Sequence, residues 1–172
     1  MSKGRWTLGL MRHAKSDWAN EGLSDHDRPL NPRGRRDAPE MAKWIANHNA
    51  IPDVILASTA KRVAQTVECL VKQWKTEPYL IRSGSLYLAS PQTILEHIRS
   101  EGIDADGRRP SRLLVVGHNP GMEDLVSSLS RNYAVMPTAA VALFDCEPMQ
   151  FDDEQAPQVT RLIAVGRPKE ID

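Results

Sequence analysis

The chain has 172 residues, in which 22 basic and 22 acidic side chains give a formal net charge of zero. This balance creates no overall field that would favour nucleic acid or an anionic membrane as a partner. A chain of this length buries roughly 70% of its unfolded surface in one core. Because no Gly/Ser-rich linker divides the chain, we expect a single domain over residues 1–172.

Apolar runs alternate with amphipathic ones along the chain, which is the pattern of βαβ units in a largely parallel sheet. We expect strands at residues 6–11, 53–57, 79–82, 112–117, 140–145 and 159–165. Apolar side chains at helical spacing predict helices at residues 32–47, 60–74, 91–100 and 121–130. Residues 147–157 are rich in proline and acids, and we expect a loop there that joins the last two strands as a hairpin. The predicted class is α/β.

The composition argues against disulfides, metals and membranes. Cys69 and Cys146 form neither a disulfide framework nor a Cys-x-x-Cys pair, and the five histidines lack metal-binding spacing. We therefore expect no metal and no cofactor. The start of the chain does not resemble a signal peptide, and no stretch approaches the roughly 18 apolar residues of a membrane helix. These observations favour a cytoplasmic protein without a membrane partner.

Two of the expected strands run directly into a histidine. The first is followed by Arg12 and His13, and the fourth by His118. Ligands of open α/β sheets bind outside the carboxyl ends of the strands, so we expect both histidines in one pocket. A single histidine is more often a core or capping residue, but Arg62, after the second strand, completes a set of two guanidinium groups and two imidazoles. Arginine donors match phosphate oxygens, and imidazole near neutral pH is either a nucleophile or a donor. The set predicts a phosphoryl site.

At these residues the chain resembles the histidine phosphatase superfamily, whose first motif is Arg-His-Gly or Arg-His-Ala after the first strand. Four further segments resemble the short bacterial SixA-like phosphohistidine phosphatases: residues 27–34 (DRPLNPRG), 62–66 (RVAQT), 117–121 (GHNPG) and 137–144 (PTAAVALF). The resemblance spans about residues 5–166. It implies a phosphoglycerate mutase-like fold of three layers, with a mostly parallel central sheet, helices on both faces and an antiparallel C-terminal hairpin.

In such a site we expect His13 to attack phosphorus and to form a phosphohistidine intermediate that water then hydrolyses. Arg12 and Arg62 would hold the phosphoryl oxygens, and His118 would donate a hydrogen bond to them. Ser16 and Asn119, close to the two histidine motifs, are further candidate phosphate contacts. The charge of His118 without a ligand stays open, because a phosphate raises its pKa and two arginines lower it.

The sequence pattern does not identify a general acid. The mutase branch has a glutamate after the third strand, whereas residues 82–90 contain no carboxylate here, and Asn119 replaces the acid that follows this histidine in the acid phosphatases. An alkoxide leaving group needs that acid, because the pKa of its conjugate acid is far above neutral. The imidazole of a phosphohistidine, once its ring is protonated, leaves as a group with a pKa of about 6.5. The missing acid favours phosphohistidine. Asp25 and Asp27 are fallback acids, although aspartates in such loops are usually turn residues, and we expect their neutralisation to matter little for phosphohistidine.

The chain has only about 20 residues between the first motif and the first helix, so the pocket should be open enough for a protein-borne phosphate. We therefore expect a metal-independent phosphohistidine phosphatase, a monomer or weak dimer, whose partner is a phosphohistidine-bearing protein or a small phosphorylated substrate. Two alternatives stay open. One is a small-molecule phosphomonoesterase that uses Asp25 or Asp27, and the other is a non-catalytic phosphate-binding module. The second is weakened because all four candidate residues are present.

Overall fold

The computed structural model describes residues 4–148 and 159–171. One sheet has the strand order β3-β2-β4-β1-β5-β6. Its strands are β1 (Trp6–Arg12), β2 (Val54–Ser58), β3 (Tyr79–Ser83), β4 (Arg112–Gly117), β5 (Val141–Cys146) and β6 (Val159–Gly166). The first four run parallel, β5 is antiparallel to β1, and β6 is antiparallel to β5. The mostly parallel sheet with an antiparallel C-terminal pair is thus confirmed, while most of the predicted hairpin loop lies outside the described residues.

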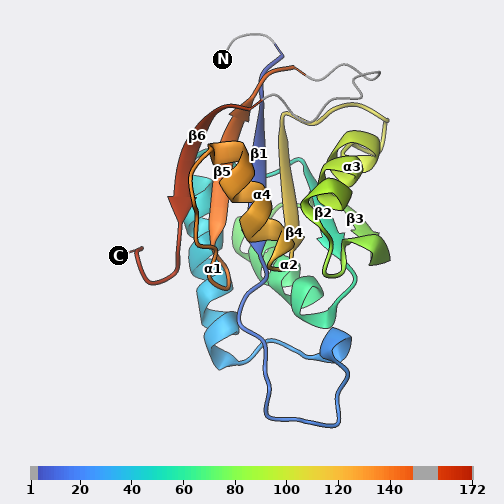
Figure 1. The fold of residues 1–172 in the computed structure, drawn as a ribbon, viewed down its shortest axis with the longest axis vertical. Helices are drawn as coiled ribbons and strands as arrows, with labels where there is room; N and C mark the ends of the chain where they lie inside the picture. The colour runs from blue at the N-terminus through green and yellow to red at the C-terminus, as the bar shows by residue number, and fades with distance from the viewer. Residues whose placement is uncertain (1–3, 149–158, 172) are drawn as a thin grey trace.

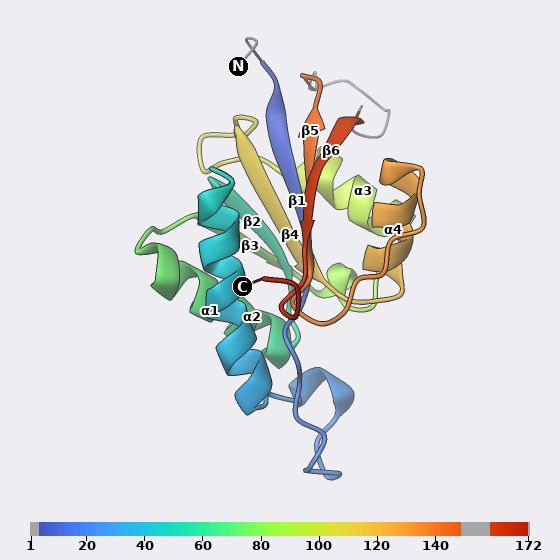
Figure 2. The ribbon, with the colours of Figure 1, turned by 90° about the vertical axis from the view of Figure 1, so that its left-hand side faces the viewer.

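Helices cover both faces of the sheet, as Figures 1 and 2 show. The helices α1 (Pro32–Asn47) and α2 (Lys61–Trp74) pack on one face, and α3 (Pro91–Glu101) and α4 (Gly121–Ser130) pack on the other. Every predicted strand and helix is present, with ends within one residue of the prediction. Two 3-10 turns, η1 (Asp25–Asp27) and η2 (Gly84–Leu86), were not predicted. Among the described residues, no helix is long and apolar enough to cross a membrane.

The side chains of β1 show why the strand is buried on both faces. Successive side chains of a strand point to opposite faces. Leu8 and Leu10 pack in the cluster under α3 and α4, whereas Met11 packs with Met41 of α1 in the cluster on the other face. A parallel sheet covered on both faces leaves its strand ends as the places where polar side chains reach solvent.

The middle of the sheet brings three such ends together. The strands β2, β4 and β1 are neighbours and run parallel, with Ala57 opposite Val116 and Arg12 opposite Gly117. The residues that follow these positions therefore meet at one edge of the sheet, although they are far apart in the sequence. This edge is where the sequence predicts the phosphoryl site.

We predict that Gly121→Ala destabilises the protein. Gly121 begins α4 against the loop before α3, and a Cβ at this position would lie 1.9 Å from the backbone oxygen of Ala89. Because two backbones would have to separate, we expect a loss of roughly 1–3 kcal/mol in the free energy of unfolding, measured by urea titration. The control is Gly84→Ala, whose Cβ would meet nothing within 4 Å. Equal stability of the two variants would contradict the prediction.

Candidate active site

The structure brings the four predicted residues of the phosphoryl site together. Arg12 ends β1 and His13 follows it, Arg62 lies in the first turn of α2, and His118 follows β4. The imidazole centroids of His13 and His118 are 5.1 Å apart. The Arg62 guanidinium lies between them, with Nε 3.2 Å from His13 Nε2 and Nη2 3.3 Å from His118 Nδ1. All four line one cavity of about 330 Å³, and the predicted phosphate contacts Ser16 and Asn119 line it too.

Hydrogen bonds from neighbouring elements hold the histidine motif in place. The backbone N–H of His13 donates to the carbonyl of Gly117 at the end of β4. The N–H of Ala14 donates to the hydroxyl of Thr66, which itself donates to the carbonyl of Arg62 one turn earlier in α2. The loop that carries His13 is thus tied both to β4 and to the helix that carries Arg62.

His13 is neutral, and its tautomer follows from its contacts. Its Nδ1 lies 2.8 Å from the carbonyl oxygen of Ala14, which only accepts, so Nδ1 carries the proton. Its Nε2 accepts a hydrogen bond from Arg62, so the lone pair of the ring is on Nε2. Burial is the main reason why the pKa of His13 is lowered to about 4, and the charges of Arg62 and Arg12 act in the same direction. At neutral pH the ring has the form that a nucleophile requires.

His118 is also neutral, in the other tautomer. Arg62 only donates, so Nδ1 of His118 accepts from it, and Nε2–H donates to the hydroxyl of Ser58 at 2.8 Å. Burial lowers the pKa of His118 to about 3, helped by His13 and Arg62. The sequence left this charge open, and the structure shows an imidazole without a proton on the nitrogen that faces Arg62.

Two polar atoms of the cavity lining lack partners. Arg12 donates from Nη1 to the carbonyl of Met136, and Asn119 donates from Nδ2 to the same carbonyl. The Nε of Arg12 and the Oδ1 of Asn119 are buried without a hydrogen bond in the part of the chain that the structure describes. Unsatisfied buried groups are rare and costly. A guanidinium N–H in this position can donate to an anionic ligand.

The structure distinguishes the two fallback acids. Asp25 lines the cavity, and its Oδ2 lies 2.9 Å from Nη2 of Arg62 and 2.5 Å from the hydroxyl of Tyr87. The hydrogen bond from Tyr87 is the main cause that lowers the pKa of Asp25, and Arg62 lowers it further. This carboxyl is therefore ionised rather than poised to donate a proton. Asp27 does not line the cavity and instead accepts from the hydroxyl of Ser24.

Sequence reasoning missed two residues that contact His118. Ser58 accepts from His118, and the ring of Tyr87 packs edge-on against the same imidazole with centroids 5.2 Å apart. Ser58 ends β2 at the edge where the other site residues gather, so its position was a usable signal. Tyr87 follows the unpredicted turn η2, and no pattern in the sequence marks it.

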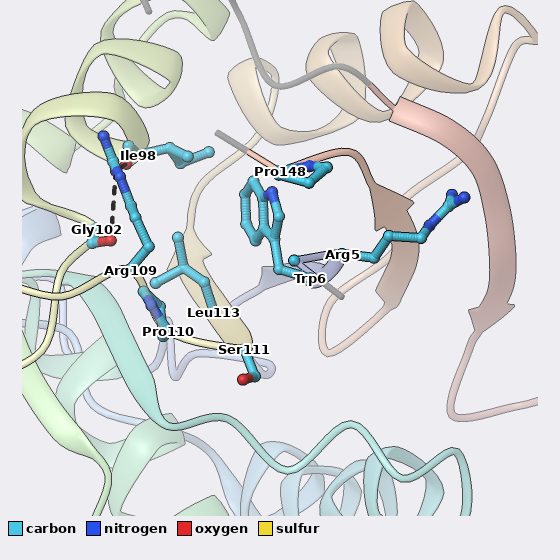
Figure 3. A pocket seen from close by; sticks show the side chains of 10 residues that line it. Arg5, Trp6, Ile98, Gly102, Arg109, Pro110, Ser111, Leu113 and Pro148 are labelled. Atoms are coloured by element: carbon cyan, nitrogen blue, oxygen red, sulfur yellow. Dashed lines mark hydrogen bonds between the residues drawn. The ribbon is translucent and has the colours of Figure 1, made fainter. Parts of the chain in front are cut away.

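A second cavity, of about 320 Å³, lies at the opposite end of the sheet, where β1 and β4 begin (Figure 3). Its cations already have partners. Arg109 donates to the carbonyls of Ile98 and Gly102 at the end of α3, and Arg5 pairs with Asp145. Apolar side chains form much of the remaining lining. This cavity does not have the chemistry of an anion site.

Basic side chains supply positive charge at the candidate site. Within residues 4–148 and 159–171, no three His, Cys, Asp or Glu side chains gather closely enough to hold a metal ion. Arg12, Arg62 and Lys15 line the cavity with the two histidines, and the two arginines carry guanidinium groups. They supply positive charge and directed donors for the oxygens of a phosphoryl group.

Comparison with known proteins agrees with this geometry. The model of the histidine phosphatase superfamily (branch 1) matches residues 8–83, which include Arg12, His13 and Arg62. A solved structure of SixA from Nakamurella multipartitia, a candidate phosphohistidine phosphatase, is 28% identical with a TM-score of 0.79, and the match covers 96% of this chain and 97% of that chain. This chain belongs to the histidine phosphatase superfamily. A SixA structure from Agrobacterium tumefaciens, also 28% identical, has a TM-score of 0.72 over 92% of this chain and 97% of that one.

Among curated proteins, an uncharacterized chloroplastic protein of Arabidopsis thaliana is 31% identical over 140 residues. That match covers 79% of this chain and 64% of the plant protein. The chain thus spans a little under two thirds of the length of the curated relatives it matches. These relatives are longer than the part they share with this chain.

The two neutral histidines predict that the protein loses stability on acidification. An unfolded histidine has a pKa near 6.5, whereas the folded values are about 4 and about 3. Between these values the unfolded chain binds protons that the folded protein does not. The free energy of unfolding should therefore be highest above pH 6.5 and fall as the pH drops toward 4, by up to about 1.4 kcal/mol per pH unit for each histidine.

Urea titrations at pH 7, 6 and 5 measure this slope. In the His118→Gln variant one of the two titrating groups is gone, and the slope should be smaller than in the wild type. A free energy of unfolding that stays constant or increases between pH 7 and pH 5 would show that the histidines are not held neutral.

Proposed function

We propose that this protein is a phosphatase that hydrolyses phosphohistidine on a protein through a covalent intermediate on His13. The observation that carries this proposal is the neutral His13, whose Nε2 lone pair lies beside the guanidinium of Arg62. Membership of the histidine phosphatase superfamily supports phosphatase chemistry, and the likeness to SixA structures supports phosphohistidine as the substrate.

In the first step, Nε2 of His13 attacks phosphorus and the bond from phosphorus to the leaving atom breaks. The electron pair of that bond goes to the leaving atom. His13 keeps its Nδ1 proton, which Ala14 accepts throughout. Arg62 Nε turns from Nε2 to the phosphoryl oxygens, and the unsatisfied Nε–H of Arg12 donates to them as well. Positioning and electrostatics of this kind supply most of the catalysis in phosphoryl transfer.

In the second step, water attacks phosphorus, the bond to Nε2 breaks, and the electron pair returns to the neutral ring of His13. His118 assists in both steps. A phosphoryl dianion raises the pKa of a neighbouring imidazole, so Nδ1 of His118 takes up a proton when the substrate binds and then donates to a phosphoryl oxygen. Ser16 and Asn119 are placed to contact the same group.

The mouth of the cavity supports a protein as the carrier of the phosphate. Trp18 and Leu88 line it and are 60% and 54% exposed. The guanidinium of Arg28 stacks on the Trp18 ring at 4.0 Å from its centroid. Large exposed apolar side chains of this kind commonly mark a protein contact. A phosphohistidine on a folded surface reaches the site while its carrier rests on this rim.

One observation favours a second candidate, a small-molecule phosphomonoesterase. Asp25 lies in the cavity, where an acid for an alkoxide leaving group would be needed. Its hydrogen bonds from Tyr87 and Arg62 keep it ionised, which disfavours this role. The two candidates differ in turnover on a phosphohistidine peptide compared with simple alkyl phosphates, and a non-catalytic phosphate-binding module would turn over neither.

We predict that His13→Ala abolishes hydrolysis of a phosphohistidine peptide without unfolding the protein. In the wild type, quenching with alkaline detergent during turnover of 4-nitrophenyl [³²P]phosphate should trap phosphate on His13 that is stable in base and lost in acid, because phosphoramidates have this lability. Mass spectrometry of the base-treated protein locates the phosphate. Turnover without labelling of His13 would exclude covalent catalysis by this residue.

Activity should persist in EDTA, because Arg12 and Arg62 supply the positive charge at the site.

Arg62→Ala should raise the activation free energy of phosphoryl transfer by roughly 3 kcal/mol, as for other donors to a developing oxyanion. Arg62→Lys should recover only part of this loss, because a single ammonium cannot donate from two directions to His13 and His118 at once. Single-turnover rates measure both effects. Full activity of the lysine variant would show that charge alone suffices.

A further inference from the structure

We propose that Asp25 recognises the leaving imidazole of the substrate, accepting a hydrogen bond from the ring nitrogen that does not carry the phosphoryl group. This inference rests on the proposed function. It assigns to the site a preference for leaving groups that present an N–H at that position, and it makes Asp25 an acceptor rather than a general acid.

The depth of the side chains places Asp25 on the leaving-group side. His13, Arg62 and His118 are 7%, 4% and 2% exposed at the floor of the cavity, whereas the side chain of Asp25 is 43% exposed. A nucleophile at the floor attacks in line, so the leaving group departs toward the mouth. The turn η1 that carries Asp25 lies beyond the carboxyl ends of the strands (Figure 1). Among the described residues that line the cavity, Asp25 is the one carboxylate.

Existing hydrogen bonds orient the Asp25 carboxylate and leave one oxygen for a ligand. Oδ2 accepts from the hydroxyl of Tyr87 and from Nη2 of Arg62, and the backbone carbonyl of Asp25 accepts from Nη1 of Arg62. Among the described residues, Oδ1 makes only a long ion-pair contact, 3.7 Å from Nε of Arg28. Oδ1 therefore has acceptor capacity for an incoming N–H.

The chemistry of the leaving group explains why such an acceptor helps. When the free ring nitrogen carries a proton, cleavage of the phosphorus–nitrogen bond sends the electron pair to the departing nitrogen and releases a neutral imidazole. Without that proton, the same cleavage would release an imidazolide anion, which is a far poorer leaving group. A carboxylate beside the N–H favours the protonated ring. No proton moves in this step, and Asp25 stays an anion throughout.

The same arrangement occurs on the nucleophile. The Nδ1–H of His13 donates to the Ala14 carbonyl while Nε2 faces phosphorus. In phosphoryl transfer between two imidazoles, each ring then donates from the nitrogen that does not face phosphorus. The acceptor is the carbonyl of Ala14 for His13 and the carboxylate of Asp25 for the substrate ring. This role revises the expectation from the sequence that neutralising Asp25 matters little for phosphohistidine, and it leaves that expectation in place for Asp27.

The test compares Asp25→Asn with the matched control Asp27→Asn, which changes the same type of residue in the same short turn outside the cavity. For each protein, kcat/KM is measured on a phosphohistidine peptide and on 4-nitrophenyl phosphate, whose leaving group has no ring N–H. We expect the ratio of the two values to fall at least tenfold in Asp25→Asn and to stay at the wild-type value in Asp27→Asn. An unchanged ratio in Asp25→Asn overturns the inference.

The pH profile gives a second readout that a purely structural role would not move. The kcat for the phosphohistidine peptide should decline above the pKa of the bound substrate ring, and this decline should begin roughly 1 pH unit lower in Asp25→Asn. If Asp25→Asn does not fold, Tyr87→Phe serves instead. It keeps the carboxylate, removes one donor to Oδ2, and should lower the substrate ratio by a smaller factor; an unchanged ratio there would count against the inference.

The outcomes separate the inference from the proposed function. A wild-type protein that hydrolyses 4-nitrophenyl phosphate but not the phosphohistidine peptide overturns both. A wild-type protein that prefers the phosphohistidine peptide, together with an Asp25→Asn variant of equal preference, overturns only the role of Asp25 and leaves the proposed function standing.

Discussion

The buried guanidinium of Arg62 is the interaction on which the site depends. It donates to Nε2 of His13, to Nδ1 of His118 and to Asp25, while its side chain is only 5% exposed. A cation in this position cannot tolerate a second positive charge on either imidazole without a large cost. Burial is the main reason why both histidines are neutral, and the charge of Arg62 acts in the same direction. Each ring presents a lone pair to Arg62, so the position of one arginine fixes which nitrogen of each ring carries that lone pair.

The fold places Arg62 there through the order of its strands. Because β4 lies between β2 and β1, the residues after three strands converge although 49 positions separate His13 from Arg62 and 56 separate Arg62 from His118. Thr66 fixes the relative position of two of them, since its hydroxyl accepts from the backbone after His13 and donates to the carbonyl of Arg62. The geometry of the site thus depends on helix α2 as much as on the sheet.

The elements could be predicted from the sequence because their signals are local, and so could the meeting of Arg12, His13, Arg62 and His118 in one cavity. Buried strands are short apolar runs, and Asn31 and Ser90 cap the helices that follow them. The choice between Asp25 and Asp27 could not be predicted. Both lie in one 3-10 turn, and only the orientation of that turn against α2 decides which carboxylate meets Arg62. The charge of His118 could not be predicted either, because it depends on contacts of the buried ring with Tyr87 and Ser58, which come from distant segments.

The pairing of Asp25 with Arg62 has a consequence for which anions the site accepts. A phosphoryl group that enters the cavity must share Arg62 with a carboxylate that is already bound to it, and the two negative charges repel each other. When the leaving group of the substrate is neutral or anionic, no positive charge offsets the repulsion between the phosphoryl group and Asp25. A protonated phosphoimidazole instead brings a positive charge that lies between its own phosphoryl group and the carboxylate. If the proposed function holds, the same ion pair weakens the binding of free phosphate and simple phosphate esters and strengthens the binding of phosphohistidine, and it does so in the ionised form that the contacts of Asp25 maintain.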